Sequence, residues 1–243
     1  MHYTLFTRVM AEFFGTAFLL ILGNGSVANV ELKGTKGTKG GWILIGIGYG
    51  CGVLIPAMMI GHVSGNHINP AFTIGLALNG MFPWNEVMPY VVAQFAGAIV
   101  GQLVVVWCYK PYYDKTTDPE AILGTFSTID AVHSNKDGVI NEFFGSFMLF
   151  FGALCMTGNI AFESNIGLAN FCVGILVGTL VVSLGGATGP ALNPARDLGP
   201  RLLHALLPLK HKGSSEWSYA WVPVLAPILG ATAAVFAYKQ LFV

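Results

Sequence analysis

Two copies of the tripeptide Asn-Pro-Ala are the residues of this chain best suited to act on a small solute. Asn69, Pro70 and Ala71 form the first copy, and Asn193, Pro194 and Ala195 form the second. Asn is a favoured helix N-cap and Pro is favoured at the first helical position, so each copy predicts the start of a helix. A capping Asn accepts from backbone N–H groups with its side-chain oxygen, which leaves its NH₂ group free as a donor.

Each tripeptide opens an apolar run that is too short to cross a bilayer. A helix from Pro70 to Gly80 is about 16 Å long, roughly half of a hydrocarbon core of about 30 Å. Two such half-helices that enter from opposite sides would meet near the middle of a membrane. There the two Asn donors would meet a water or hydroxyl oxygen, and the positive helix ends would repel cations and hydronium. The alternative is two ordinary helix caps with no lumen between them.

The composition indicates an integral membrane protein with a single domain, residues 1–243. Of the 243 residues, 54% are apolar and 10% are charged, whereas soluble domains carry about 25% charged residues. The net charge is zero, which gives no reason to expect nucleic acid as a partner. The four cysteines and six histidines show no metal-ligand spacing, so we predict no metal and no cofactor. We expect no cleavable signal, because Arg8 precedes an apolar run of full spanning length.

The chain contains six apolar segments of about the length that a spanning helix needs. These segments are Val9 to Val30, Trp42 to Gly61, Val87 to Cys108, Val139 to Phe162, Ile166 to Leu184 and Ala220 to Leu241. The half-helices are expected from Pro70 to Gly80 and from Pro194 to about Leu203. The longest polar connection, residues 110–137, is predicted to be the only substantial loop. The predicted fold class is therefore an all-α membrane protein with six spanning helices and two half-helices.

The two halves of the chain repeat each other. Glu12-Phe13-Phe14-Gly15 recurs as Glu142-Phe143-Phe144-Gly145, and both copies open the first spanning segment of their half. Three spans per repeat is an odd number, so the second copy, residues 138–243, is inverted relative to the first, residues 1–109. Inverted repeats with broken helices commonly build a site at the bilayer midplane. Non-helical backbone at that depth must line protein or a watery cavity, which argues for a pore.

With these features the chain resembles the major intrinsic protein family, the aquaporins and glycerol facilitators. The resemblance covers nearly the whole chain and is carried by His62 to Ala71 and by Gly189 to Asp197. Within the family, Asp197 directly after Arg196 resembles the glycerol-conducting branch, the aquaglyceroporins. Pro223-Val224 also resembles that branch, and Gly124 to Thr128 resembles bacterial glycerol facilitators.

The resemblance implies a selectivity filter near the outer mouth of the pore, formed by Tyr49, Val181, Pro190 and Arg196. Arg196 would donate to solute hydroxyls, and the apolar walls would face the carbon edge of the solute. Usual glycerol facilitators place Trp, Gly and Phe where this chain has Tyr49, Val181 and Pro190, so the size limit is open. For these three residues the alternative is plain helix and loop packing.

The resemblance also implies residues that support the two polar stretches before the half-helices. Glu12 and Glu142 would accept hydrogen bonds from the backbone of these stretches; the alternative is a carboxylate at headgroup level. His67 is expected to be a packed, hydrogen-bonded side chain, although it could line the inner lumen. Asp197 is expected to pair with nearby backbone or with an arginine.

The predicted function is a passive channel for glycerol and other small uncharged solutes, and for water, that excludes protons and ions. One alternative cargo is an undissociated hydroxy acid such as lactic acid. A second alternative is an ion-coupled secondary transporter, which would need titratable groups along its path. An enzyme ranks last, because the spans contain no nucleophile–base pair or metal cluster.

The resemblance further implies a homotetramer in the plasma membrane, with the bilayer around it and both termini in the cytoplasm. That orientation places eight lysines outside, namely Lys33, Lys36, Lys39, Lys110, Lys115, Lys136, Lys210 and Lys212. The positive-inside rule favours the reverse orientation. We follow the resemblance, because acidic residues outnumber the lysines of the long loop.

Overall fold

The computed structural model describes residues 3–158 and 165–243, and its regular structure within these ranges is entirely helical. Six helices are long and apolar enough to cross a membrane. They are α1 (Leu5–Glu31), α2 (Trp42–Ser64), α4 (Trp84–Tyr113), α6 (Asn135–Thr157), α7 (Ile166–Thr188) and α9 (Val222–Phe242). Each coincides with one of the six predicted spans, which confirms the predicted all-α membrane fold. The last predicted residues of the fourth span, including Phe162, lie outside the described residues.

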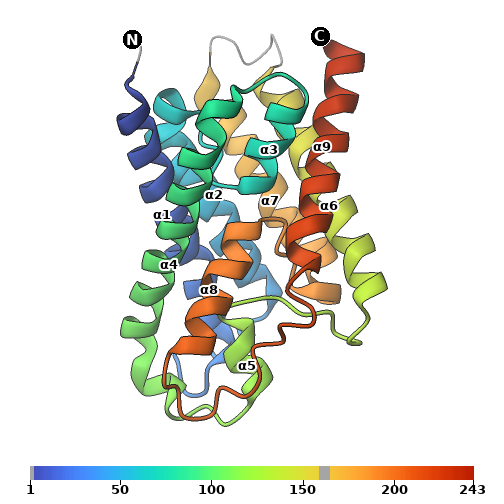
Figure 1. Ribbon diagram of the computed structural model, residues 1–243. Helices are drawn as coiled ribbons and strands as arrows, with labels where there is room; N and C mark the ends of the chain where they lie inside the picture. Colours follow the sequence, from blue (N-terminus) through green and yellow to red (C-terminus); the bar gives the residue numbers. More distant parts are fainter. Residues whose placement is uncertain (1–2, 159–164) are drawn as a thin grey trace.

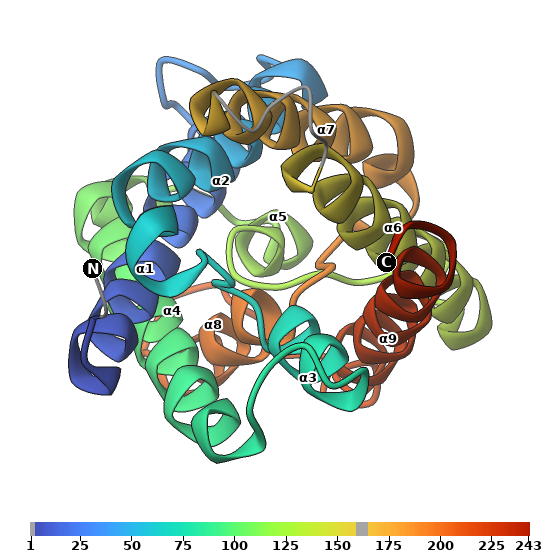
Figure 2. The same cartoon turned by 90° about the horizontal axis from the view of Figure 1, so that it is seen from above.

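The long helices run along a common axis, with both chain termini at the same end of the bundle (Figure 1). Seen along that axis, they form an open ring, and two short helices, α3 (Pro70–Leu78) and α8 (Pro194–Leu206), lie between α4 and α9 where the ring is open (Figure 2). In this ring α1 packs on α2 and α4, α6 packs on α7 and α9, and α2 packs on α7. The contact between α2 and α7 therefore joins the two halves of the chain.

The two half-helices are α3 (Pro70–Leu78) and α8 (Pro194–Leu206). Helix α3 packs mainly on α9, and α8 packs mainly on α4, so each half-helix lies against a long helix of the other half. Helix α3 ends before the predicted Gly80, which has the left-handed φ of 73° that favours glycine. Helix α8 extends beyond the predicted Leu203. The ammonium of Lys212 donates to carbonyl oxygens at the end of this helix, those of His204, Ala205 and Leu207, at 2.7–2.8 Å.

The long connection contains a helix that we did not predict. Helix α5 (Pro119–Gly124) interrupts it, and α4 and α6 extend into its two ends. The signal for α5 is a cap: the Asp118 carboxylate accepts from the N–H groups of Glu120 and Ala121, and Pro119 is the first helical residue. The prediction that residues 110–137 form one loop is therefore wrong, because helices occupy both ends of this range and part of its middle.

Glycine allows close approach between α2 and α7. A Cβ added to Gly178 would lie 2.9 Å from the carbonyl oxygen of Gly46, and one added to Gly50 would lie 2.8 Å from that of Gly174. Such distances leave no room for a larger residue at Gly50 or at Gly178. Small residues at helix contacts are the usual means of close packing in membranes.

Candidate functional site

A cavity of about 530 Å³ lies inside the ring of helices. Its lining includes His62 near the end of α2, Thr157 at the end of α6 and Ile166 at the start of α7. Tyr49 and Arg196 also line the cavity, and most of its other lining residues are apolar. The cavity lining includes all the predicted filter residues, both capping asparagines and His67, namely Tyr49, Asn69, Asn193, Val181, Pro190, Arg196 and His67.

Asn69 and Asn193 cap the two half-helices and also join them to each other. The Asn69 oxygen accepts from the N–H of Ala71 at 2.9 Å, and the Asn193 oxygen accepts from Ala195 at 3.0 Å. Each NH₂ group donates to the polar stretch of the opposite half. The Asn69 nitrogen lies 2.7 Å from the carbonyl oxygen of Leu192, and the Asn193 nitrogen lies 2.8 Å from that of Ile68.

The expectation that each NH₂ group is entirely free is therefore wrong. One of its two hydrogens binds the other half of the chain, so a single N–H on each asparagine remains for a solute. Pro70, Ala71, Pro194 and Ala195 are buried at the starts of the two helices and do not line the cavity. The structure places them as the first helical turns behind the asparagines.

Glu12 lies fully buried behind the first polar stretch. Its carboxylate accepts from the backbone N–H groups of His67 at 2.9 Å and Ile68 at 2.6 Å. The Ser64 hydroxyl and the Gln94 amide also donate to it, at 2.6 and 2.9 Å. Ile68 has a left-handed φ of 42°, which costs free energy for a β-branched residue. The buried carboxylate holds that backbone in place, which fits the loop contact and not a headgroup position.

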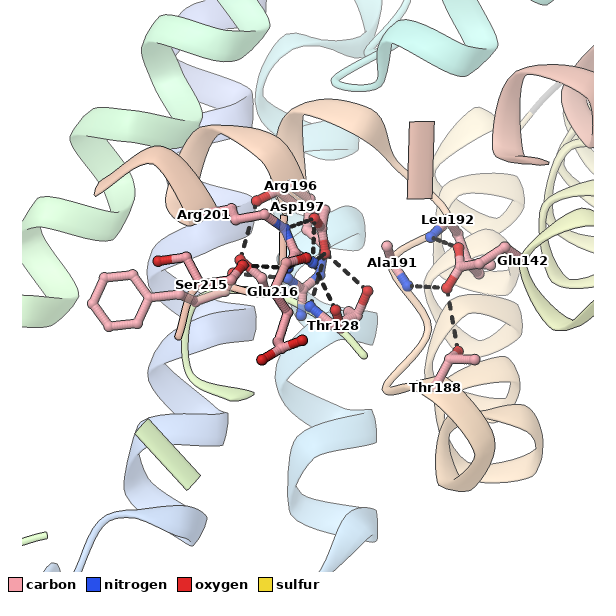
Figure 3. Close-up of polar contacts among 12 residues, drawn as sticks. Thr128, Glu142, Thr188, Ala191, Leu192, Arg196, Asp197, Arg201, Ser215 and Glu216 are labelled. Carbon is pink, nitrogen blue, oxygen red and sulfur yellow. Dashed lines mark hydrogen bonds and ion pairs between the residues drawn. The ribbon is translucent and has the colours of Figure 1, made fainter. Parts of the chain in front are cut away.

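Glu142 occupies the corresponding place behind the second polar stretch, as Figure 3 shows. It is fully buried and accepts from the N–H groups of Ala191 and Leu192, both at 2.8 Å, and from the Thr188 hydroxyl at 3.2 Å. Leu192 has a left-handed φ of 50°. The carboxylates thus stabilise two strained loops that point the half-helices at each other.

Arg196 is 3% exposed, and both of its terminal nitrogens have partners. One donates to the carbonyl oxygen of Phe126 at 3.1 Å, and the other donates to the Tyr49 hydroxyl. The guanidinium carbon also lies 5.0 Å from the centre of the Tyr49 ring. Val181 and Pro190 are buried against the same cavity. The four predicted filter residues therefore lie around one cavity, although their part in selectivity stays a prediction.

Asp197 points away from the cavity and belongs to a buried ion pair (Figure 3). It accepts from the Arg201 guanidinium at 2.9 Å and from the N–H and hydroxyl of Thr128, both at 2.8 Å. Arg201 also donates to the carbonyl oxygens of Thr128, Ser215 and Glu216 at 2.6–3.1 Å. This pair ties α8 to two connections, residues 125–134 and 207–221. We did not identify Arg201 from the sequence, although its position four residues after Asp197 on a helix was a usable signal.

His67 is packed among aromatic side chains and also lines the cavity, so both environments expected for it are present. Its ring nitrogen lies 3.1 Å from the Thr73 hydroxyl, and aromatic rings of Phe72, Phe82 and Tyr90 surround it at centroid distances of 4.8–5.3 Å. In the parts of the chain that the structure describes, no three His, Cys, Asp or Glu side chains form a group that could hold a metal.

Six spanning helices around a cavity in which two capped half-helices meet define a membrane transport protein of the inverted-repeat type. The comparison with family models identifies it further: the model described as "Major intrinsic protein" matches residues 1–238, so the chain belongs to this family. Membership confirms both the predicted resemblance and the prediction that the chain is a transport protein and not an enzyme.

Known proteins of this family resemble the chain over its full length. "Glycerol uptake facilitator protein-like 5" of Lactiplantibacillus plantarum is 54% identical, covering 97% of this chain and 96% of the relative. "Glycerol facilitator-aquaporin gla" of Lactococcus lactis subsp. cremoris is 48% identical, covering 97% of each chain. The X-ray structure of the aquaglyceroporin from Plasmodium falciparum has a TM-score of 0.88 and 29% identity, covering 98% of this chain and 97% of that one.

Proposed function

We propose that this protein is a passive channel for glycerol and other small uncharged solutes, and for water. The observation that carries the proposal is the cavity with an apolar wall and a few fixed donors, those of Asn69, Asn193 and Arg196. Glycerol has hydroxyls along one edge and carbon along the other, so both edges find a complementary surface. The names of the bacterial relatives support glycerol as the solute.

The proposed exclusion of protons and ions follows from the same donors. The remaining N–H of each asparagine donates to the oxygen of a passing water. This orientation interrupts a chain of water molecules that could relay protons. The N-terminal ends of α3 and α8 and the Arg196 guanidinium add positive charge to the same path, which opposes cations. Anions would have to lose their hydration between apolar walls.

Swelling of proteoliposomes in glycerol tests the proposal, with two matched variants of α7. Val181→Trp places an indole in the cavity, whereas Val182→Trp places it at the next residue, whose side chain is 48% exposed on the outside of the bundle. We expect rapid swelling with the original protein and with Val182→Trp, and near-complete loss with Val181→Trp. Equal swelling with both variants would show that the cavity is not the path, and swelling no faster than protein-free liposomes would refute the channel.

The same assay addresses lactic acid as the cargo. Tyr49 and Pro190 replace the two larger rings that usual glycerol facilitators carry, which leaves a filter of different shape and one extra hydroxyl. Swelling in lactic acid, at a pH low enough to keep the acid undissociated, is compared with swelling in glycerol. A faster rate for lactic acid would make the hydroxy acid the preferred cargo.

The cavity lining gives little support for an ion-coupled transporter. Among the described lining residues none is Asp or Glu, and Glu12 and Glu142 face the loops and not the lumen. We therefore expect glycerol flux that rises linearly with concentration and is unchanged by a proton or sodium gradient. Saturation at low concentration together with gradient dependence would favour the transporter.

The proposed setting is the plasma membrane, with both termini in the cytoplasm and four copies in one assembly. The structure supports only one part of this, the common face of the two termini. A C-terminal tag should stay inaccessible to antibody in intact cells and become accessible after permeabilisation. Labelling of intact cells would reverse the orientation, and chemical cross-linking in membranes that stops at a dimer would exclude the tetramer.

A further inference from the structure

A closed ring of hydrogen bonds surrounds the end of the Arg196 side chain. Arg196 donates to the Tyr49 hydroxyl, and that hydroxyl donates to the side-chain oxygen of Asn24. The Asn24 nitrogen then donates to the carbonyl oxygen of Phe126 at 3.2 Å, the same oxygen that accepts from Arg196 at 3.1 Å. The ring thus joins α1, α2, α8 and the segment after α5.

Asn24 belongs to this ring, but it belongs to none of the motifs or filter positions that the sequence predicts. It is fully buried in α1 and does not line the cavity. Its nitrogen also donates to the Gln102 oxygen at 2.6 Å, and Gln102 in turn donates to the carbonyl oxygen of Thr125 at 3.1 Å. Both hydrogens of the Asn24 amide are therefore paired, one with Gln102 and one with Phe126. Its oxygen accepts from the Tyr49 hydroxyl.

The neighbouring residue explains why the Tyr49 ring lies so close to Asn24. A Cβ on Gly23 would lie 2.2 Å from a carbon of the Tyr49 ring, so glycine is required there. The ring therefore rests on the backbone of α1, and its hydroxyl reaches Asn24 one residue further. Unpaired polar groups at this depth are costly, so the bonds that pair the Asn24 amide, the Tyr49 hydroxyl and the Phe126 carbonyl hold these groups in a single arrangement.

The ring has two consequences for a passing solute. Tyr49 and Arg196 both line the cavity and contact each other, so fixing one to the other fixes the part of the cavity wall that they form together. The ring also engages one N–H on each terminal nitrogen of Arg196, which determines the donors that are left for the solute. The Nε atom of Arg196 is buried and has no partner among the described residues, so the donors left for a solute are the second N–H groups of the two terminal nitrogens.

We propose that Asn24 is a specificity-determining positioning residue of the channel. It fixes the Tyr49 hydroxyl and the Phe126 carbonyl on two sides of Arg196, and in this way it sets the size of solute that passes. The inference rests on the proposed channel function and extends it to a residue outside the cavity wall. Without Asn24, Tyr49 and Arg196 lose their common anchor to α1, and the width of the cavity between them and the opposite wall becomes variable.

The experiment measures the ratio of erythritol to glycerol permeability in proteoliposomes. A ratio is independent of the amount of inserted protein, so a merely structural loss of active channels leaves it unchanged. We expect Asn24→Leu and Tyr49→Phe each to raise this ratio several-fold. The double variant should match Tyr49→Phe alone, because both changes break the same ring. Tyr219→Phe is the matched control: its hydroxyl is also buried but has no partner among the described residues, so the ratio should not change.

An unchanged ratio for Asn24→Leu in a protein that conducts glycerol would overturn the inference and leave the proposed function intact. Additive effects in the double variant would overturn it too, because Asn24 and Tyr49 would then act independently. If Asn24→Leu does not assemble, Asn24→Ser is measured instead, since serine is too short to reach the Tyr49 hydroxyl and has the same expected result. Absence of glycerol flux in the unaltered protein would instead refute the proposed function.

Discussion

The two buried glutamates differ in one donor, and this difference predicts which loop is easier to disturb. Glu12 has a fourth donor in Gln94. In the internal repeat Ala93-Gln94 matches Ala226-Pro227, and proline has no side-chain donor. Glu142 therefore depends on two backbone N–H groups and one hydroxyl. The second polar stretch has less redundancy than the first.

Glu142→Gln should destabilise the protein, because a glutamine NH₂ group would face a backbone N–H that then has no acceptor. An orphaned buried donor costs about 1–3 kcal/mol. The midpoint of thermal unfolding in detergent should fall clearly below that of the original protein. Glu120→Gln, on a side chain that is 75% exposed, is the control and should leave the midpoint in place. Equal midpoints for both variants would contradict the role of Glu142 behind the loop.

The Asp197–Arg201 pair offers a second test at the residue scale. Asp197→Asn leaves the fully buried Arg201 without its countercharge, and breaking such a pair costs about 3–5 kcal/mol. Replacing both residues with apolar ones, Asp197→Leu with Arg201→Met, should recover part of this loss, because no buried charge then remains. Chemical unfolding in micelles measures all three proteins. A double variant less stable than Asp197→Asn would show that the contacts to the neighbouring loops, and not the charge, dominate.

At the scale of elements, the contact between α2 and α7 depends on facing glycines. Gly178→Ala should destabilise the protein by about 1–3 kcal/mol, because the added methyl group would press on the backbone of α2. Gly186→Ala on the same helix has open space around it and should be neutral or stabilising by up to about 1 kcal/mol. Thermal unfolding of the two variants side by side checks the prediction, and equal midpoints would contradict it.

The elements could be predicted from the sequence where a strong local signal exists. Long apolar runs located the six spans, and Asn-Pro pairs located the starts of α3 and α8. Their ends were less certain, because Lys212 stabilises the end of α8 from a separate loop. Helix α5 was missed because six residues are too few for a recognisable apolar period, and only the Asp118-Pro119 cap signalled it.

The candidate site was predictable in its motif residues and not in their partners. Asn69, Asn193 and Arg196 belong to recognisable stretches, and the structure brings them to one cavity. Asn24 and Gln102 come from two segments far apart in the chain, and no local pattern distinguishes them from ordinary buried residues. Phe126 lies in the stretch from Gly124 to Thr128, whose resemblance did not indicate a contact with Arg196. The crossed bonds of the two asparagine NH₂ groups were missed for the same reason, since their acceptors lie in the other half.

At the scale of the whole molecule, positive charge gathers at the centre without a carboxylate in the described cavity lining. We therefore expect no ionic current through planar bilayers that contain the purified protein, at any holding potential that the bilayer tolerates. The control is glycerol flux through vesicles made from the same preparation, which shows that the protein is active. A robust current from such a preparation would contradict the proposed exclusion of ions.

The exchange of hydrogen bonds between Asn69 and Leu192, and between Asn193 and Ile68, has a consequence for biosynthesis. The nascent chain reaches the membrane with its first half complete, yet the acceptor for Asn69 is more than a hundred residues away. Until the ribosome has delivered the second tripeptide, the first re-entrant segment lacks its partner in a medium that supplies no substitute. The aperture therefore forms only after the second half has entered the membrane and docked on the first. A chain truncated before that point carries no partly open pore that could leak.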